Sequence, residues 1–291
     1  MWAVIIHGGA GGLAEPQIEA DRQALERALI WAKRELEQNH RALDVAEGVI
    51  RLLEDCGNFV AGKGSSPNSA GAWELDASIC DGPTQRAGAV AALSGVYPPI
   101  SIARAVMERT KHVLLAGAGA AAFARDCGFE DITDPASFFV PSRGRPPASG
   151  GSAHGTVGAV VLDTTGAIAA GTSTGGITGK LPGRVGDSPI VGAGCWADEV
   201  VGVSCTGAGE FFLRTAAAHS VSAYCRLARM ELGAAVEAAL ADVAKLQGRG
   251  GIIAIDRRGG VKYTFNTEAM RVARADSSGQ HEVTVARRDP S

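Results

Sequence analysis

A segment with little regular patterning, residues 128 to 155, divides the chain and limits how the parts on either side of it can fold. It contains four prolines and several glycines and serines, a composition typical of a linker. Directly after it, two apolar runs at 156–162 and 167–171 flank an Asp-Thr-Thr-Gly turn, which predicts a β-hairpin. A long linker that ends abruptly where a core strand begins indicates a functional boundary at Thr156.

Apolar periodicity elsewhere predicts strands and helices that come in blocks. The other expected strands are at 2–6, ending in a turn at His7-Gly-Gly-Ala-Gly11, and at 73–79, 87–93, 200–205, 252–256, 261–265 and 282–286. The expected helices are at 25–36, 43–55, 101–107, 116–125, 209–226 and 231–247, and Ser101 is the expected cap of the third. This order favours the α+β class over a doubly wound parallel sheet.

Composition limits the class of protein. Of the 291 residues, 46% are hydrophobic and 20% are charged, so the chain can bury the core of one large domain or of two small ones. The net charge is −3 with both signs interspersed, and the three tyrosines and four tryptophans do not cluster. These features predict that nucleic acid is not a partner.

The first residues and the cysteines bear on the cellular compartment. The segment from Met1 to His7 lacks the basic start and the apolar stretch of a signal peptide, and no later run approaches roughly 18 apolar residues. The six cysteines occur without C-x-x-C spacing, which suits reduced, mostly buried thiols better than disulfides or zinc. We therefore expect a cytoplasmic protein that does not span a membrane.

The junction His154-Gly155-Thr156 is a candidate cleavage site. A threonine with a free amino group can be nucleophile and base at once, because its α-amine has a pKa of about 7.7–8.0 and can accept the hydroxyl proton. Gly155 tolerates the strained backbone that self-cleavage requires, since it has no Cβ. Taken alone, a Gly-Thr pair after a linker is more often a plain start of a strand, so the surrounding motifs decide.

Eight motifs follow one another from one end of the chain to the other. They are His7-Gly-Gly-Ala-Gly11, Ala61-Gly-Lys-Gly-Ser65, Glu74-Leu-Asp-Ala-Ser78, Gly155-Thr-Val-Gly-Ala-Val160, Thr172-Ser-Thr-Gly-Gly176, Lys180-Leu-Pro-Gly-Arg-Val-Gly-Asp-Ser-Pro189, Ser204-Cys-Thr-Gly207 and Phe265-Asn-Thr267. In content and order they resemble the plant-type asparaginase family, whose members are isoaspartyl dipeptidases and L-asparaginases.

The resemblance implies a four-layer αββα sandwich of the N-terminal nucleophile hydrolase type. Residues 1–291 are then one domain that cuts itself into two chains, 1–155 and 156–291. The linker at about 128–155 ends the first chain. Two such pairs of chains are expected to assemble as a dimer of heterodimers.

The resemblance also assigns roles to four residues. Thr156 is the nucleophile, and Thr174 orients its hydroxyl group. Thr206 and the backbone N–H of Gly207 form the oxyanion hole, which stabilises the charge that develops on the attacked carbonyl. From its position at a strand end that opens a helix, Thr206 is equally suited to be an ordinary helix cap.

Arg184 and Asp187 are the candidate substrate-binding residues. They lie three residues apart, and together they offer a fork for an α-carboxylate and an anion for an α-ammonium. The resemblance implies that they hold the aspartyl group of isoaspartyl dipeptides or of asparagine, whose side-chain carbonyl Thr156 attacks. A β-aspartyl ester forms, and water then releases aspartate without any catalytic cofactor.

A sodium ion is the one inorganic group that the resemblance implies. Backbone carbonyls suit a hard cation and leave almost no side-chain signature. The carbonyls implied are those of Leu53, Glu54, Cys56, Phe59, Ala61 and Lys63.

Two residues depart from the usual pattern of the family. Val60 stands where asparagine is usual, which removes an amide near the nucleophile and bears on maturation and rate. Ala208 stands where a polar residue is common, next to the expected oxyanion hole.

Three other functions remain to be compared with this one. Residues 57–63 match a phosphate-binding loop, but Gly64 replaces the required Ser or Thr and a helix rather than a strand is expected before it. A glycosylasparaginase is the nearer alternative, although a signal peptide would then be expected. A binding protein that keeps the fold without cleavage is the third.

Overall fold

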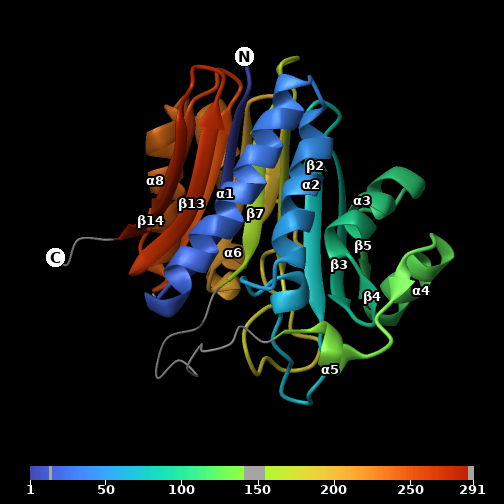
Figure 1. Ribbon diagram of the computed structural model, residues 1–291. Coiled ribbons are helices and arrows are strands. Elements are labelled where there is room, and N and C mark those ends of the chain that lie inside the picture. The colour runs from blue at the N-terminus through green and yellow to red at the C-terminus, as the bar shows by residue number, and fades with distance from the viewer. Residues whose placement is uncertain (13–14, 141–154, 288–291) are drawn as a thin grey trace.

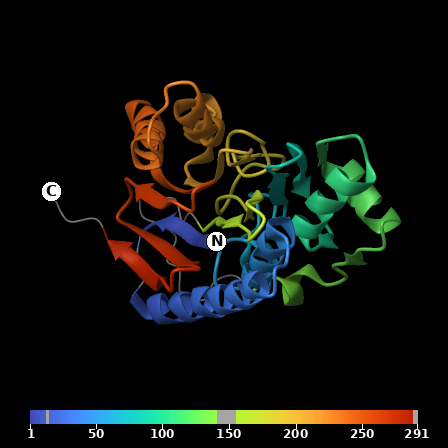
Figure 2. The ribbon, with the colours of Figure 1, turned by 90° about the horizontal axis from the view of Figure 1, so that it is seen from above.

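The computed structural model describes residues 1–12, 15–140 and 155–287, in which two β-sheets pack face to face with helices on their outer sides (Figures 1 and 2). The helices are α1 (Glu15–Glu37), α2 (Ala42–Asp55), α3 (Pro99–Arg109), α4 (Gly117–Asp126), α5 (Pro135–Phe138), α6 (Gly209–Thr215), α7 (Ala217–Arg226), α8 (Leu232–Lys245) and the 3-10 turn η1 (Gly62–Gly64). Within these ranges, no helix is long and apolar enough to cross a membrane.

The larger sheet has eight strands in the order β14-β13-β1-β7-β8-β2-β3-β5. Their bounds are β1 Ala3–Gly11, β2 Leu75–Asp81, β3 Arg86–Leu93, β5 Leu114–Ala116, β7 Val157–Leu162, β8 Ile168–Thr174, β13 Ala269–Asp276 and β14 His281–Arg287. All neighbours are antiparallel except β3 and β5, which are parallel. The sheet is therefore mixed, and the predicted hairpin of β7 and β8 lies near its centre.

The second sheet is antiparallel and has four strands in the order β12-β11-β10-β9. Their bounds are β9 Cys195–Ala197, β10 Val201–Gly207, β11 Gly250–Asp256 and β12 Val261–Phe265. A short separate pair consists of β4 (Val96–Tyr97) and β6 (Glu130–Asp131). Helices and antiparallel strands together make this a mixed structure of the α+β class, as the order of the elements predicts.

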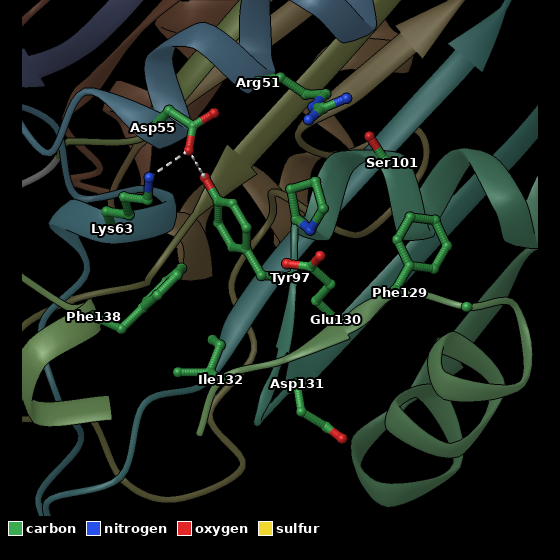
Figure 3. A pocket seen from close by; sticks show the side chains of 12 residues that line it. Arg51, Asp55, Lys63, Tyr97, Ser101, Phe129, Glu130, Asp131, Ile132 and Phe138 are labelled. Atoms are coloured by element: carbon green, nitrogen blue, oxygen red, sulfur yellow. Dashed lines mark hydrogen bonds and ion pairs between the residues drawn. The ribbon is translucent and has the colours of Figure 1, made fainter. Parts of the chain in front are cut away.

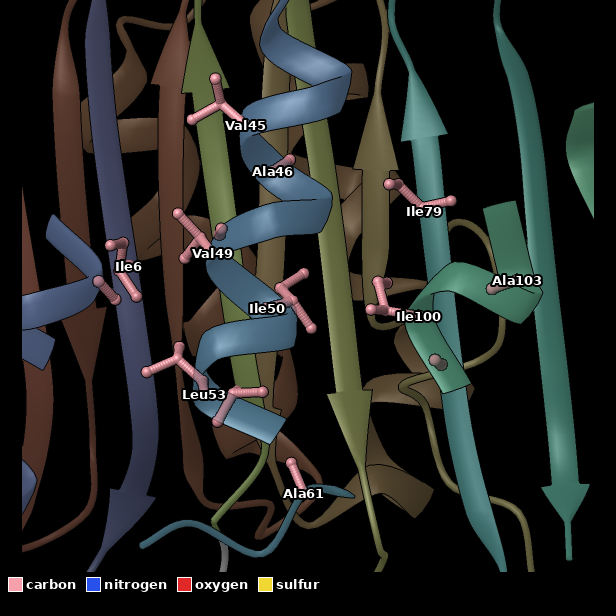
Figure 4. Packing of buried hydrophobic residues seen from close by; sticks show 14 of the residues in the cluster. Ile6, Val45, Ala46, Val49, Ile50, Leu53, Ala61, Ile79, Ile100 and Ala103 are labelled. Atoms are coloured by element: carbon pink, nitrogen blue, oxygen red, sulfur yellow. The ribbon is translucent and has the colours of Figure 1, made fainter. Parts of the chain in front are cut away.

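Three clusters of buried side chains hold these parts together. On one side of the large sheet, α2 directs Val49, Ile50 and Leu53 into a cluster that also contains Ile6 of β1 and Ile79 of β2 (Figure 4). The second cluster lies between the two sheets, and the third lies between the small sheet and helices α7 and α8. Because each sheet is covered on one face by helices and on the other by a sheet, the strand ends near Thr156 are held from both sides.

The first strand is longer than its sequence indicates. The expected turn after residue 6 is wrong, because β1 continues to Gly11 with a shift in register between His7 and Ala10. The longer strand depends on a partner that the sequence pattern did not reveal, since β13 pairs with β1 on both sides of the shift, from Ala3 to His7 and again at Ala10 and Gly11. The strand β13 was not predicted because the charge of Arg271 interrupts its apolar pattern. In the structure Arg271 is buried and pairs with Asp21 at 2.5 Å.

Two helix expectations are also corrected. The helix expected at 209–226 is two helices, because Ala216 adopts a left-handed conformation (φ 46°) that ends α6 and begins α7. The third helix begins at Pro99 and has no side-chain cap; Ser101 instead donates to the carboxylate of Glu47. In the expected linker, the residues up to 140 include β6 and α5, and residues 141–154 lie outside the described ranges.

All six cysteine thiols are free. Cys80 and Cys195 face each other between the sheets, with their Sγ atoms 3.7 Å apart. Of the six, Cys80, Cys195 and Cys205 are buried, and the other three are half-buried.

Candidate active site

Thr156 lies immediately before β7 and is only 7% exposed. Its Oγ1 donates a hydrogen bond of 3.1 Å to Oγ1 of Thr174, the last residue of β8. This contact follows from the hairpin register, because Val157 pairs with Ser173 and the next residues outward are therefore opposite each other. The structure thus brings together the two threonines that the sequence singled out.

The hydroxyl group of Thr174 is held by three partners. Besides the hydroxyl of Thr156, it accepts the N–H of Gly176 at 3.0 Å and donates to the carbonyl of Val60 at 3.3 Å. Because its own proton points to Val60, its oxygen is left to accept the proton of Thr156. The lone pairs of Thr156 Oγ1 can then face an incoming carbonyl group.

Gly155 is packed against the segment that carries Val60. A Cβ atom on Gly155 would lie 2.6 Å from the backbone nitrogen of Val60 and 2.8 Å from its Cγ2. A larger residue before Thr156 would therefore require this segment to move. The departure at Val60 lies directly against the bond between Gly155 and Thr156.

Thr206 and Gly207 end β10, one of the two inner strands of the second sheet. Thr206 is buried and its Oγ1 accepts the N–H of Ala10 at 3.4 Å, which ties β10 to β1. At Gly207 the backbone has φ 154°, and a Cβ atom would lie 2.4 Å from the carbonyl oxygen of Arg249. Only glycine fits there, so the backbone of this strand end is fixed.

His7 connects the two strand ends. Its Nδ1 lies 3.1 Å from the carbonyl oxygen of Thr156, and its Nε2 lies 2.9 Å from Oγ of Ser204. Ser204 and Thr206 lie on the same face of β10, because side chains alternate along a strand. The structure therefore directs Thr206 towards the sheet that carries Thr156.

The bonding partners assign the charge and tautomer of His7. A carbonyl oxygen only accepts, so Nδ1 carries the proton and Nε2 accepts from the hydroxyl of Ser204. Burial lowers the pKa of His7 to about 3, although the bond to the Thr156 carbonyl opposes this shift. His7 is therefore a neutral link, and it is a strand residue rather than the turn residue that the sequence predicts.

Arg184 and Asp187 share an irregular loop that packs against the start of α6. Arg184 pairs with Glu210, with its Nε at 2.9 Å and its Nη2 at 2.8 Å from Oε1. Asp187 is buried, and a Cβ atom on Gly209 would lie 2.7 Å from its Oδ1. Both residues thus lie beside the helix that follows Gly207.

The carboxyl group of Asp187 has a pKa close to neutral pH. Burial raises its pKa to about 7, although the positive charge of Arg184 opposes the rise. Within the described ranges, its Oδ2 is buried and has no hydrogen-bond partner. A cationic group that enters this loop would supply the missing partner and favour the carboxylate form.

A second buried carboxyl group, that of Glu54, lies below the hairpin. Ser173 donates to its Oε1 at 2.6 Å and the N–H of Ile100 does so at 3.3 Å. Burial raises its pKa to about 8. The sequence analysis singled out only the backbone carbonyl of Glu54. It did not predict a role for the carboxyl group, because no sequence pattern places Ser173 against the end of α2.

The segment expected to hold sodium begins in the last turn of α2 and continues to Lys63. Leu53 and Glu54 belong to the last helical turn, where carbonyls lack the N–H partner of the helix interior, and the carbonyl of Leu53 accepts the thiol of Cys56 at 3.1 Å. The carbonyl of Phe59 accepts the N–H of Ala61 at 2.8 Å, and that of Lys63 accepts the N–H of Val140 at 2.8 Å. A second lone pair remains on each of these two oxygens.

A separate pocket of about 490 Å³ opens between the end of α2, the β4–β6 pair and α5 (Figure 3). On its wall, Asp55 pairs with Lys63 at 2.8 Å and accepts the Tyr97 hydroxyl at 3.2 Å. The expected catalytic and substrate-binding residues are not among those lining it. Lys63 follows a helix and is paired with a carboxylate, so the phosphate-loop alternative lacks its strand and its free lysine.

The chain is similar to known proteins along most of its length. A family model described as asparaginase matches residues 1–146 and 140–285. An isoaspartyl peptidase of Salmonella typhimurium is 43% identical, over 92% of this chain and 93% of that protein.

Two further relatives come from distant organisms. A plant-type L-asparaginase of Thermococcus kodakarensis is 41% identical, over 94% of this chain and 96% of its own. A probable isoaspartyl peptidase/L-asparaginase of Arabidopsis thaliana is 37% identical, over 98% of both chains.

The low pKa of His7 gives a testable dependence of stability on pH. The unfolded chain binds a proton at the ordinary value of 6.5, whereas the folded chain resists it down to about 3. Above pH 6.5, neutral His7 does not reduce the free energy of unfolding. As the pH drops from 6.5 towards 3, protonation of the unfolded chain lowers this free energy by about 1.4 kcal/mol per pH unit. His7→Gln should lose this slope in urea unfolding curves, and the exposed-site control His112→Gln should keep it. Equal slopes in all three proteins would contradict the assignment.

Proposed function

Because this chain belongs to the asparaginase family, we propose that it hydrolyses the side-chain amide of aspartyl compounds and releases L-aspartate from isoaspartyl dipeptides, L-asparagine or both. The single observation that carries the proposal is the hydroxyl pair of Thr156 and Thr174, directly after the Gly155–Thr156 bond. The relatives from Salmonella and Thermococcus are named for these two activities.

The proposal requires that the chain be cut before Thr156. In the uncut chain the nitrogen of Thr156 is an amide, which is not a base. Cleavage turns it into an α-amine with a pKa of about 7.7–8.0, which can accept the proton of the hydroxyl group. Residues 1–155 and 156–291 then form the two chains of one domain.

The proposed chemical steps use the hydroxyl of Thr156, the α-amine that cleavage frees, and two donors at the end of β10. Thr156 Oγ1 attacks the side-chain carbonyl carbon, and its proton passes to the α-amine and then to the departing amine. The hydroxyl of Thr206 and the N–H of Gly207 are the proposed donors to the oxyanion. Water then attacks the ester, with the same amine as base, and aspartate leaves.

Recognition of the aspartyl group is assigned to Arg184 and Asp187. The guanidinium binds the α-carboxylate, which requires that it exchange its contact with Glu210 for the substrate. The Asp187 carboxyl group, which lacks a partner for one oxygen, binds the α-ammonium. Both isoaspartyl dipeptides and asparagine carry these two groups, so one site can accept either.

The same proposal extends to the architecture and the assembly. The three buried clusters support an αββα sandwich of the N-terminal nucleophile hydrolase type. We retain a dimer of heterodimers as the assembly, which native mass spectrometry would test. We also retain the predicted cytoplasmic location, which cell fractionation would test.

The proposed function predicts self-cleavage. Intact-mass measurement of the purified wild type should give two fragments that end at Gly155 and begin at Thr156. Thr156→Ala should remain one chain, and the control Thr178→Ala, at an exposed threonine, should be cut as the wild type is. An uncut wild type that is also inert would support the non-catalytic binding protein instead.

The role of Asp187 gives a second prediction. A succinyl peptide offers the same amide without the α-ammonium, so the wild type should favour the β-aspartyl peptide by roughly 100-fold in kcat/KM. Asp187→Asn should lose most of that preference by raising KM for the β-aspartyl peptide. Asp242→Asn on α8 is the control and should keep it. An unchanged preference in Asp187→Asn would exclude Asp187 as the ammonium partner.

We also propose a structural sodium ion at the end of α2, held by the carbonyls of residues 53, 54, 56, 59, 61 and 63. The negative end of the helix dipole favours a cation there. Binding at about 100 times the dissociation constant adds about 2.7 kcal/mol to the stability. The melting temperature should therefore be higher in sodium chloride than in choline chloride of equal ionic strength; identical values would overturn the site.

A further inference from the structure

Lys180 and Asp76 form an ion pair inside the protein. Both side chains are fully buried, and Lys180 Nζ lies 3.9 Å from Asp76 Oδ2. The ammonium group also donates to the carbonyl of Glu74 at 2.9 Å, and Asp76 Oδ1 accepts the N–H of Ala92 at 2.7 Å. Within the described ranges, Oδ2 of Asp76 has no hydrogen-bond partner.

A pair of this kind is a poor source of stability. Removing two charges from water carries a penalty that their attraction offsets only when the geometry is close and every polar atom is satisfied. Here the charged atoms are 3.9 Å apart and one carboxylate oxygen is unsatisfied. Well-packed apolar side chains of similar size would stabilise the fold as well or better, so the pair calls for another role.

Its position indicates that role. Asp76 is the β-sheet partner of Thr174, because β2 pairs with β8 in that register. The Cδ of Lys180 lies only 2.7 Å from where a Cβ atom of Gly176 would be, and its Nζ lies 3.0 Å from that point. The N–H of Gly176 in turn donates to the hydroxyl of Thr174.

We propose that Lys180, held by Asp76, is a positioning residue that fixes the turn from Thr174 to Gly176 and so keeps the Thr174 hydroxyl group facing Thr156. The lysine stem fills the space that the missing side chain of Gly176 leaves, and its charge is tied to the strand that carries Asp76. The turn cannot swing away from Thr156 without breaking these contacts. This inference rests on the proposed function, because it concerns the same nucleophile.

The test separates orientation of the nucleophile from stability of the fold. Lys180→Met, Asp76→Asn and the double variant are compared with the wild type as full-length proteins. The measurements are the melting temperature, the rate of self-cleavage by intact mass, and kcat and KM on a β-aspartyl dipeptide per cleaved molecule. The surface pair Lys33 and Glu37 supplies the matched controls Lys33→Met and Glu37→Gln, which should behave as the wild type.

We expect Lys180→Met to lower kcat by roughly 10- to 100-fold with little change in KM, because a small displacement of a reacting group has a large effect on rate. Each single variant leaves one buried charge alone and should melt earlier. The double variant removes both charges and should regain the melting temperature but not kcat. If any variant accumulates no cleaved enzyme, its self-cleavage rate serves as the same readout.

Two results would overturn the inference. One is a kcat or a self-cleavage rate that returns in the double variant together with the melting temperature, which would make the pair purely structural. The other is a Lys180→Met enzyme with the kcat of the wild type. A wild type that neither cuts itself nor hydrolyses the dipeptide would instead refute the proposed function.

Discussion

The register between β7 and β8 is the constraint on which the candidate site depends. It places Val157 opposite Ser173, and therefore the hydroxyl of Thr156 beside that of Thr174. A slip of one residue would turn every side chain of β7 to the other face of the sheet. Close packing opposes such a slip, because a side chain at the position of Gly158 would place its Cβ atom 2.0 Å from Oγ of Ser204 and 2.4 Å from Nε2 of His7.

Several buried polar groups of the protein are not fully satisfied, and three of them lie near this register. Within the described ranges, five buried side chains each have one atom without a hydrogen-bond partner: Glu54, Ser65, Asp76, Asp187 and Arg271. Glu54 contacts Ser173 beside Thr174, Ser65 packs on Gly175, and Asp76 pairs with Thr174 in the sheet. Such groups lower stability. The position of three of them beside Thr174 and its neighbours is typical of a site where stability has been given up for function.

The sequence pattern predicted those helices and strands that depend on residues close to one another in the chain. The hairpin after the linker and most helices could be predicted, because periodicity and turn residues act over a few positions. The strand at 269–276 could not, since the charge of Arg271 is neutralised by Asp21, which lies 250 residues away. For the same reason the length of β1 was underestimated, as its continuation depends on pairing with that strand.

The sequence by itself determined which chemical groups are available: a threonine after a glycine at the end of a linker, a second threonine on the paired strand, and an arginine and an aspartate in one loop. Only the tertiary structure decided what surrounds them. It placed His7 between Thr156 and Ser204, turned Arg184 towards Glu210 and buried Lys180 with Asp76 behind Thr174. These contacts join residues far apart in the chain, and they form only when the packing of two sheets closes the distance.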